Sequence, residues 1–188
     1  MIADHDRSGY FGASDTDKVI GNWKTKTWAN WWMQKLGINT DHFDNRYTLA
    51  GTNWEHRILD SLGIPGLRKD EQYIIEDLLL RVNLDGNTDD CIYEVKTFQW
   101  EKGFKLPQKY INQVRVQMYG SKIRKAKIIA YGLEEADYDN FLRPVDPSRI
   151  LVFEIEYDEN WIVTKYLPKL RPLADCLKRG VMPSEALI

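Results

Sequence analysis

The first third of the chain repeats its hydrophobic residues at the spacing of an α-helix. Trp28, Trp31 and Trp32 fall on one face of the segment TKTWANWWMQKLG, so this face is predicted to pack against a core. A longer helix is predicted over residues 46–63, where Gly63 and the Ile-Pro-Gly that follows give a stop signal. A shorter helix is expected before both of them, within GASDTDKVIG.

The hydrophobic pattern changes to the period of β-strands from residue 72 onward. QYIIED and LLLRVNLD predict one or two strands or a hairpin, and CIYEVKTF predicts a further strand rich in β-branched and aromatic residues. GNTDD, which separates them, has the composition of a turn. KAKIIAYGL and ILVFEIEYD predict two more strands later in the chain.

Two helices are predicted between and after these strands. One runs near residues 108–123, with Ile111, Val114 and Met118 forming its buried stripe. The other covers about residues 159–179, where two prolines should kink or interrupt it.

The order of helices, strands, helix, strands and helix indicates an α/β fold with a central mixed β-sheet. No repeat or Gly/Ser linker divides the chain, so a single domain over residues 1–188 is expected. Its N-terminal helices would occupy about 13–62, its sheet and following helix about 72–157, and its C-terminal helix about 159–179. No glycine-rich phosphate loop follows a predicted strand, which disfavours a nucleotide-binding fold.

Composition limits the location of the protein and its metal chemistry. No apolar run approaches the roughly 20 residues that cross a bilayer, and the first residues lack the pattern of a signal peptide. We therefore expect a cytoplasmic protein without a membrane partner. Two cysteines and three scattered histidines form no close pair suited to structural zinc.

The charge of the chain is unevenly distributed. The net charge of −2 argues against simple electrostatic binding of nucleic acid. Residues 100–130, however, hold one acidic residue, Glu101, and eight basic ones. Such a stripe can bind phosphates, and it fits a solvated helix face equally well. The basic residues are Lys102, Lys105, Lys109, Arg115, Lys122, Arg124, Lys125 and Lys127.

Acidic side chains end two neighbouring predicted strands. Residues two apart on a strand face the same side, so Glu94 and Lys96 project together, as do Asn83 and Asp85. Pairing of the two strands across GNTDD can bring Asp85 beside Glu94. Two adjacent carboxylates repel each other unless a cation lies between them, and hard oxygen ligands suit Mg²⁺ or Mn²⁺.

A lysine beside such a site points to hydrolysis of a phosphodiester, because it can orient or deprotonate the attacking water. Taken alone, the spacing of Asp85, Glu94 and Lys96 also fits the ordinary alternation of charged and apolar residues on a half-exposed strand. Glu55, from the preceding helix, could extend toward the same site. The later helix sets amides on one face, and amides can hold a phosphate or a water without adding charge.

The ordered motifs RSGYFGASD, GTNWEHRIL, LDG, YEVK and YINQVRVQM resemble those of the lambda-type exonucleases, or YqaJ-like viral recombinase nucleases. These belong to the PD-(D/E)xK superfamily, so the resemblance implies a restriction-endonuclease-like core, a central mixed sheet flanked by helices. The similarity runs from about Arg7 to Met118 and continues into EIEYDENW.

The resemblance implies a role for each matching residue at the metal site. Asp85 and Glu94 would bind the metal, with the Val95 carbonyl as a further ligand. Lys96 would be the catalytic lysine. Glu55 would support a second metal ion, and the side chain of Gln113 would lie near the nucleophile and the terminal phosphate.

A second set of matching residues would bind the DNA. Arg7 and Ser14 keep the spacing of the pocket that grips the 5′-phosphate, although Ser14 also fits a helix cap and Arg7 a surface charge. Asn83 stands where some members have a phosphate-binding serine, and Leu84 replaces the expected proline. The remaining candidates for phosphate or DNA contact are Gln117, Lys102, Lys105, Lys109 and Arg115.

The implied activity is that of a Mg²⁺-dependent 5′-to-3′ exonuclease on linear double-stranded DNA, with two ions and Mn²⁺ as the alternative metal. It would leave 3′ overhangs for single-strand-annealing recombination in a bacterial cell, in a phage or prophage context. A ring-shaped trimer and a single-strand-annealing partner are also implied. An endonuclease on the same core and a catalytically silent DNA-binding module remain rival hypotheses. The tryptophans could stack on bases, but burial in the core explains them better.

Overall fold

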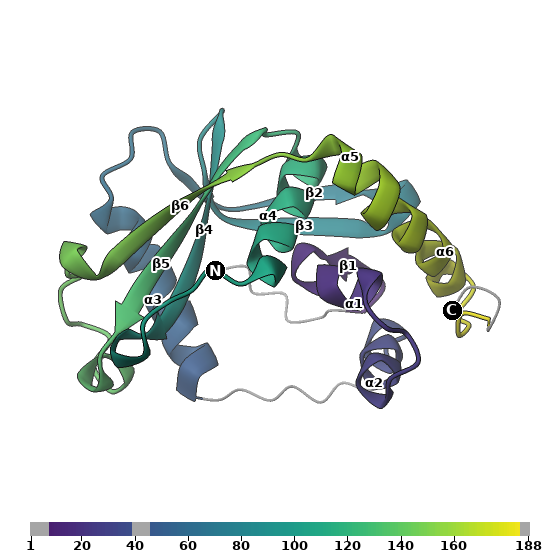
Figure 1. Ribbon diagram of the computed structural model, residues 1–188, viewed down its shortest axis with the longest axis horizontal. Helices are drawn as coiled ribbons and strands as arrows, with labels where there is room; N and C mark the ends of the chain where they lie inside the picture. The colour runs from purple at the N-terminus through teal and green to yellow at the C-terminus, as the bar shows by residue number, and fades with distance from the viewer. Residues whose placement is uncertain (1–7, 39–45, 185–188) are drawn as a thin grey trace.

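The computed structural model describes residues 8–38 and 46–184, and a six-stranded mixed sheet forms its centre. β1 runs parallel to β3 and β4 runs parallel to β5, whereas the other neighbouring strands are antiparallel. The α/β fold with a central mixed sheet is therefore confirmed (Figure 1). The strands are β1 (Phe11–Gly12), β2 (Arg68–Ile75), β3 (Leu80–Asn87), β4 (Cys91–Gln99), β5 (Lys125–Leu133) and β6 (Ile150–Glu156).

Helices cover both faces of this sheet. Ile129 of β5 packs in a cluster with α3, while the adjacent Ile128 packs in a cluster with α4. Because neighbouring strand residues point to opposite faces, α3 and α4 lie on opposite sides of the sheet. The helices are α1 (Thr16–Ile20), α2 (Lys26–Lys35), α3 (Arg46–Ser61), α4 (Gln108–Ser121), α5 (Glu159–Trp161) and α6 (Leu167–Lys178).

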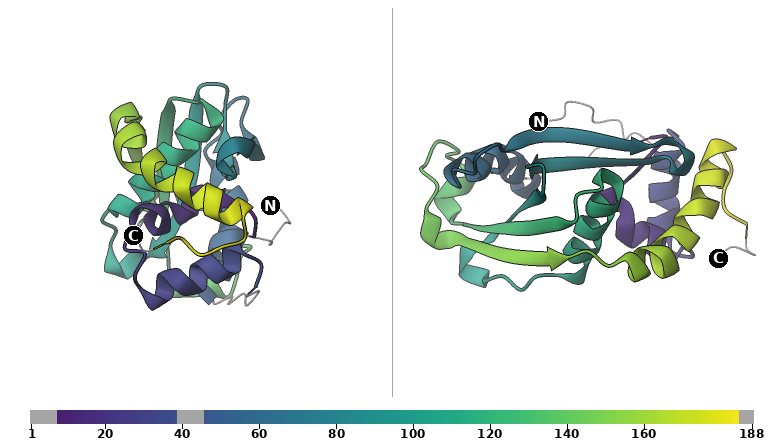
Figure 2. Two further views of the ribbon diagram at one scale, coloured as in Figure 1. Left: turned by 90° about the vertical axis from the view of Figure 1, so that its right-hand side faces the viewer. Right: turned by 90° about the horizontal axis from the view of Figure 1, so that it is seen from above.

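The tryptophans of α2 are part of a third hydrophobic cluster, which joins α1, α2 and α6 to the sheet. Trp28, Trp31 and Trp32 are all buried, and the rings of Trp28 and Trp32 stack with their centroids 5.4 Å apart. Their expected place in the core is confirmed. Figure 2 shows the β2–β3 pair extending toward α6, where the Lys178 ammonium donates to the Asp77 carbonyl at 2.7 Å.

Several boundaries differ from those predicted. β2 begins at Arg68, whereas its predicted start was residue 72. The first half of this strand is charged and shows no hydrophobic alternation, so the sequence pattern did not reveal it. α4 ends at Ser121, since Lys122 adopts a left-handed conformation with φ of 65°. β1 has two residues, too few to show a period, and was not predicted.

The C-terminal helix is interrupted before its prolines rather than at them. A π-helical turn over Ile162–Tyr166 joins α5 to α6. Pro168 then lies in the first turn of α6, where its missing N–H costs little, and Pro172 lies inside the helix. Among the described residues, no helix is long and apolar enough to cross a membrane.

One stretch of β3 lies beside an opening in the sheet. β2 pairs along one edge of β3, so β1 and β4 must share its other edge. On that edge β1 pairs with Leu80 and Arg81, and β4 pairs with Gly86 and Asn87. Asn83 and Asp85 fall between these two pairings, at the point where β3 and β4 separate.

Candidate active site

The register of β3 and β4 brings the two predicted carboxylates together. Gly86 pairs with Tyr93, so Asp85 and Glu94 follow one step further along the two strands. Asp85 Oδ2 accepts a hydrogen bond of 2.8 Å from the backbone N–H of Val95. The Asp85 side chain therefore accepts a hydrogen bond from the backbone of β4 at the point where β3 and β4 separate.

Glu94 is buried and surrounded by donors. Its Oε1 accepts hydrogen bonds from Lys96 Nζ at 2.6 Å and from Gln113 Nε2 at 2.5 Å. Its Oε2 accepts one from Gln117 Nε2 at 2.6 Å. Strand β4 thus supplies the carboxylate and the lysine, while one face of α4 supplies both amides. The structure brings Asp85, Glu94, Lys96 and Gln113 together.

Two carboxylates of this site have raised pKa values. Burial and the nearby Glu94 and Glu55 raise the pKa of Asp85 well above its usual range. Burial and Glu94 likewise raise the pKa of Glu55, partly offset by His56. In both groups burial is the largest cause of the shift, and repulsion by neighbouring carboxylates is the second.

Lys96 remains an ammonium group here. Burial by itself lowers the pKa of Lys96, but the negative charges of Glu94 and Asp85 outweigh it and raise this pKa above its ordinary value. The ammonium also lies 4.9 Å from the centroid of the Tyr110 ring. This arrangement favours charge compensation or orientation of a water over proton abstraction by Lys96.

Glu55 lies on α3 beside two residues, His56 and Asp70, that were not predicted as site residues. His56 and Asp70 place ligand atoms within 4.8 Å of one another and of a Glu55 oxygen. His56 Nε2 is 3.1 Å from Asp70 Oδ2. In the β2–β3 register, Asp70 falls opposite Asp85. Asp70 was missed because β2 was expected to begin two residues later.

The donor set fits a divalent cation. The carboxylates of Asp85, Glu94 and Glu55 supply hard oxygen ligands, and the raised pKa values of Asp85 and Glu55 reflect negative charge that a cation would neutralise. The Val95 carbonyl remains a predicted ligand, while the Val95 side chain is buried in the cluster with α3.

The predicted phosphate-binding residues lie in two places and partly outside the described chain. Ser14 is exposed in the 3-10 turn Ala13–Asp15, next to the edge of β3 that carries Asn83. It caps no helix, and the residue before α1, Asp15, makes no side-chain cap bond either. Asn83 is exposed and its Oδ1 accepts from Gln72 Nε2 at 3.0 Å. Arg7 lies outside the described residues.

The structure separates the predicted basic residues. Lys102, Lys105 and Lys109 are exposed between β4 and the first turn of α4, and Lys109 Nζ is 5.1 Å from the centroid of the Tyr110 ring. Lys109 therefore shares this ring with Lys96. Arg115 lies on another face of α4, where its guanidinium is 3.4 Å from Asp158 Oδ2.

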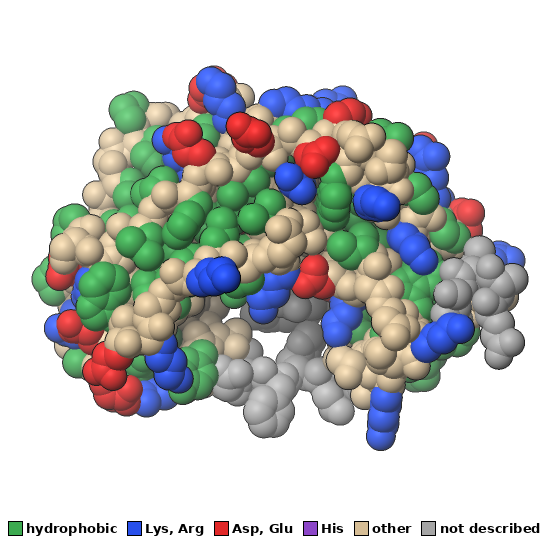
Figure 3. Space-filling view, in the orientation of Figure 1, with side chains coloured by type: hydrophobic (Ala, Val, Ile, Leu, Met, Phe, Trp, Pro, Cys, Tyr) green, Lys and Arg blue, Asp and Glu red, His purple; other side chains and the backbone are tan. Residues whose placement is uncertain are grey.

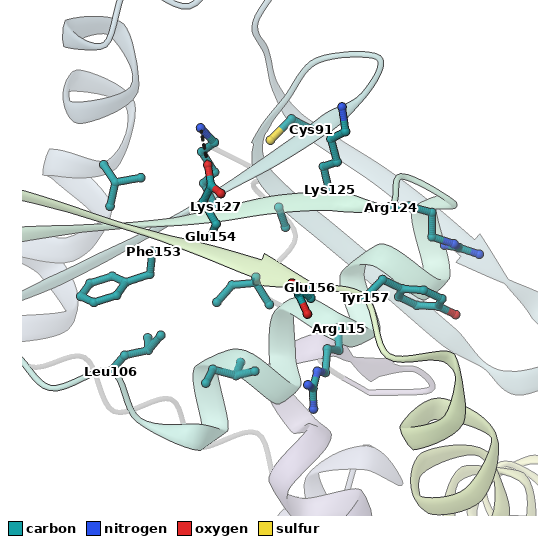
Figure 4. A pocket seen from close by; sticks show the side chains of 14 residues that line it. Cys91, Leu106, Arg115, Arg124, Lys125, Lys127, Phe153, Glu154, Glu156 and Tyr157 are labelled. Atoms are coloured by element: carbon teal, nitrogen blue, oxygen red, sulfur yellow. Dashed lines mark ion pairs between the residues drawn. The ribbon is translucent and has the colours of Figure 1, made fainter.

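Arg115 lines a hollow of about 910 Å³ between α4 and strands β5 and β6 (Figure 4). Lys127 and Glu154 form an ion pair of 3.2 Å on its wall. Hydrophobic side chains gather over β5 and β6 in the space-filling view (Figure 3), and Val152 is half exposed there. The predicted site residues Asp85, Glu94 and Lys96 are not among those that line this hollow.

No protein-family model and no curated protein sequence matches the chain. Solved structures do match. LHK-Exo in complex with dAMP has a TM-score of 0.68 at 18% identity, over 91% of this chain and 89% of that chain. The alkaline exonuclease LHK-Exo from Laribacter hongkongensis has a TM-score of 0.62 at 21% identity, over 91% and 92%.

A phage-related exonuclease from Haemophilus somnus 129PT is also similar, with a TM-score of 0.61 at 15% identity over 91% of this chain and 92% of that chain. All three cover nearly the full length of both chains, so the likeness extends beyond strands β3 and β4. The chain has the fold of these alkaline and phage-related exonucleases, which is the fold that its ordered motifs predicted.

Proposed function

We propose that the protein is a Mg²⁺-dependent exonuclease that degrades one strand of linear double-stranded DNA in the 5′-to-3′ direction. The observation that carries this proposal is the convergence of Asp85, Glu94 and Lys96 where β3 and β4 separate. The similar solved structures are described as exonucleases, which supports an exonuclease over other nucleases on this fold. The product would carry 3′ overhangs suited to single-strand annealing.

The proposed chemistry divides between the ions and the chain. When bound, divalent ions would supply an activated water and neutralise charge on the leaving oxygen. Asp85 and Glu94 would hold one ion, together with the Val95 carbonyl. Glu55 would support a second ion, with His56 and Asp70 beside it. Lys96 would orient the water through its ammonium group.

The proposed DNA contacts form two groups. Ser14 and Arg7 would bind the 5′-phosphate, with Asn83 on the adjacent strand as a further donor. Lys102, Lys105 and Lys109 would follow the backbone of the DNA. From the motif resemblance, we also propose a ring-shaped homotrimer and a single-strand-annealing protein as partner.

The decisive experiment compares three DNA substrates with purified protein and Mg²⁺. On a linear duplex with a 5′-phosphate, the 5′-ended strand should be released as mononucleotides and the complementary strand should remain. The same duplex with a 5′-hydroxyl should be degraded more slowly, and a closed circle should remain intact. EDTA should stop degradation. Cutting of the circle would support the rival endonuclease, and equal rates on both linear duplexes would exclude the proposed phosphate contact of Ser14.

Lys96→Ala tests the site itself. We expect the rate on linear duplex to fall at least about 100-fold, because the positioned lysine acts in the transition state. Lys165→Ala is the control, since Lys165 is exposed on the π-helical turn before α6. A wild-type protein that binds DNA but shows no metal-dependent cleavage would be the silent DNA-binding module.

A further inference from the structure

Gln117 is a buried amide that joins the two strands of the candidate site. Its side chain is 1% exposed, and its Nε2 donates both to Glu94 Oε2 at 2.6 Å and to the Asn83 carbonyl at 3.1 Å. Glu94 belongs to β4 and Asn83 to β3. One amide group of α4 therefore spans the opening where these strands separate.

The other half of the same amide is unusual. Gln117 Oε1 is shielded from solvent and has no hydrogen-bond partner among the described residues. A buried acceptor without a donor costs free energy, so such an atom calls for a functional or missing partner. A water molecule that enters with a cation is a donor of the right kind for this place.

The three donors around Glu94 are not equivalent. Lys96 and Gln113 share Oε1, and both are only partly buried, so they can withdraw when a ligand binds that oxygen. Gln117 alone among them occupies Oε2, and its second bond to the Asn83 carbonyl fixes it in place. Oε1 is thus the replaceable side of the carboxylate, and Oε2 is the anchored side.

We propose that Gln117 is a positioning residue for the metal-binding carboxylate of Glu94, rather than a DNA contact. It fixes Oε2 through its N–H group, leaves Oε1 to the cation, and accepts a hydrogen bond through its own Oε1 from a water that enters with the ion. The inference rests on the proposed function in one respect, namely that Glu94 binds a divalent ion. Partners that orient a ligand in this way contribute strongly to metal affinity.

Gln117→Met tests this role, because methionine has a similar length and volume but lacks both the donor and the acceptor. Gln108→Met is the matched control on the same helix, since Gln108 Nε2 donates to Asn112 Oδ1 at 3.0 Å and not to Glu94. The probe is Mn²⁺, titrated into metal-free protein and followed by the electron paramagnetic resonance signal of the free ion. Circular dichroism and thermal unfolding in EDTA establish that each variant is folded.

We expect Gln117→Met to bind Mn²⁺ about 10–100-fold more weakly than wild type, and Gln108→Met to bind it as wild type does. Should Gln117→Met not fold, Gln117→Asn takes its place, since asparagine keeps an amide but draws it back from Glu94. The expectation for its Mn²⁺ affinity is the same.

The possible outcomes separate this inference from the proposed function. If Gln117→Met or its replacement binds Mn²⁺ as tightly as the wild type does, the positioning role is wrong. The proposed nuclease function would still stand in that case, provided that the wild-type protein cleaves DNA. Equal weakening in Gln108→Met would also overturn it, because the effect would then belong to the helix as a whole. Wild-type protein that binds no Mn²⁺ and cleaves no DNA would remove the proposed function together with this role.

Discussion

At the scale of single residues, Asp85 is expected to lower the stability of the metal-free protein and is proposed to bind the metal ion. Asp85→Asn should keep the hydrogen bond from the Val95 N–H, because the asparagine carbonyl can accept it. It should lower nuclease activity at least about 100-fold by removing a charged metal ligand. In EDTA, at a pH where Asp85 is ionised, it should raise the free energy of unfolding by about 1–3 kcal/mol, since a half-buried charge beside Glu94 and Glu55 is lost.

Thermal unfolding in EDTA measures the second effect, at roughly 2–4 °C in Tm for each kcal/mol. Asp17→Asn serves as control, because Asp17 is exposed on α1 and its replacement should change stability by less than about 0.5 kcal/mol. A variant that loses activity and also unfolds at a lower temperature would contradict the assigned role of Asp85, since its carboxylate would then be structural.

The sequence sufficed to predict the pair Asp85 and Glu94, because the two-residue period of a strand and a short turn fix which side chains can meet. It could not predict the contacts of Gln117 with Glu94 and the Asn83 carbonyl. Those contacts depend on how closely α4 approaches β3, and no local pattern in the helix sequence reports that distance.

At the scale of elements, that approach of α4 to β3 depends on a glycine. A Cβ atom added at Gly120 would lie 2.7 Å from Val82 Cγ2, whereas one added at Gly51 of α3 would meet Thr97 Oγ1 at an ordinary 3.5 Å. Gly120→Ala should therefore lower the free energy of unfolding by about 1–3 kcal/mol, in spite of the better helix propensity of alanine.

Gly51→Ala is the matched substitution in the other helix and should raise the free energy of unfolding by about 0.5–1 kcal/mol. Urea unfolding of both variants at constant pH measures the two effects. Equal stabilisation by both alanines would show that α4 does not rely on close contact with Val82 to place its amides.

Elements with a clear hydrophobic period were the ones that the sequence predicted well. The stripe of Val114 and Met118 located α4, and both side chains are fully buried. The first half of β2 is charged, so Asp70 stayed outside the predicted strand and its place opposite Asp85 could not be foreseen. The π-helical turn before Pro168 was also missed, because it depends on how α5 and α6 pack on the core.

At the scale of the whole molecule, the charge at the candidate site should make the stability of the metal-free protein depend on pH. The folded state raises the pKa of Asp85 above 3.8 and that of Glu55 above 4.5. Each group therefore holds its proton in the folded protein after the unfolded chain has released it. Their contribution to stability is complete below these ordinary values and is lost as the pH rises through the folded-state pKa values.

Wild type and Asp85→Asn should consequently diverge in EDTA as the pH rises above 3.8, the ordinary pKa of an aspartate, because the variant lacks this group. The raised pKa of Lys96 does not affect this window, since its contribution is lost only at a pH above the ordinary value of 10.5. Thermal unfolding across the pH series measures the difference in Tm, which should widen toward higher pH.

Added Mg²⁺ should reverse this loss in the wild type. A cation that binds only the folded state stabilises it by about 2.7 kcal/mol at 100 times its Kd, and binding requires ionised carboxylates. The rise in Tm on adding Mg²⁺ should therefore be larger at about pH 8 than at about pH 5 in the wild type, and nearly absent in Asp85→Asn at both. An equal Mg²⁺ effect in the two proteins would mean that the ion binds elsewhere, and the excess negative charge around Asp85 would then need another explanation.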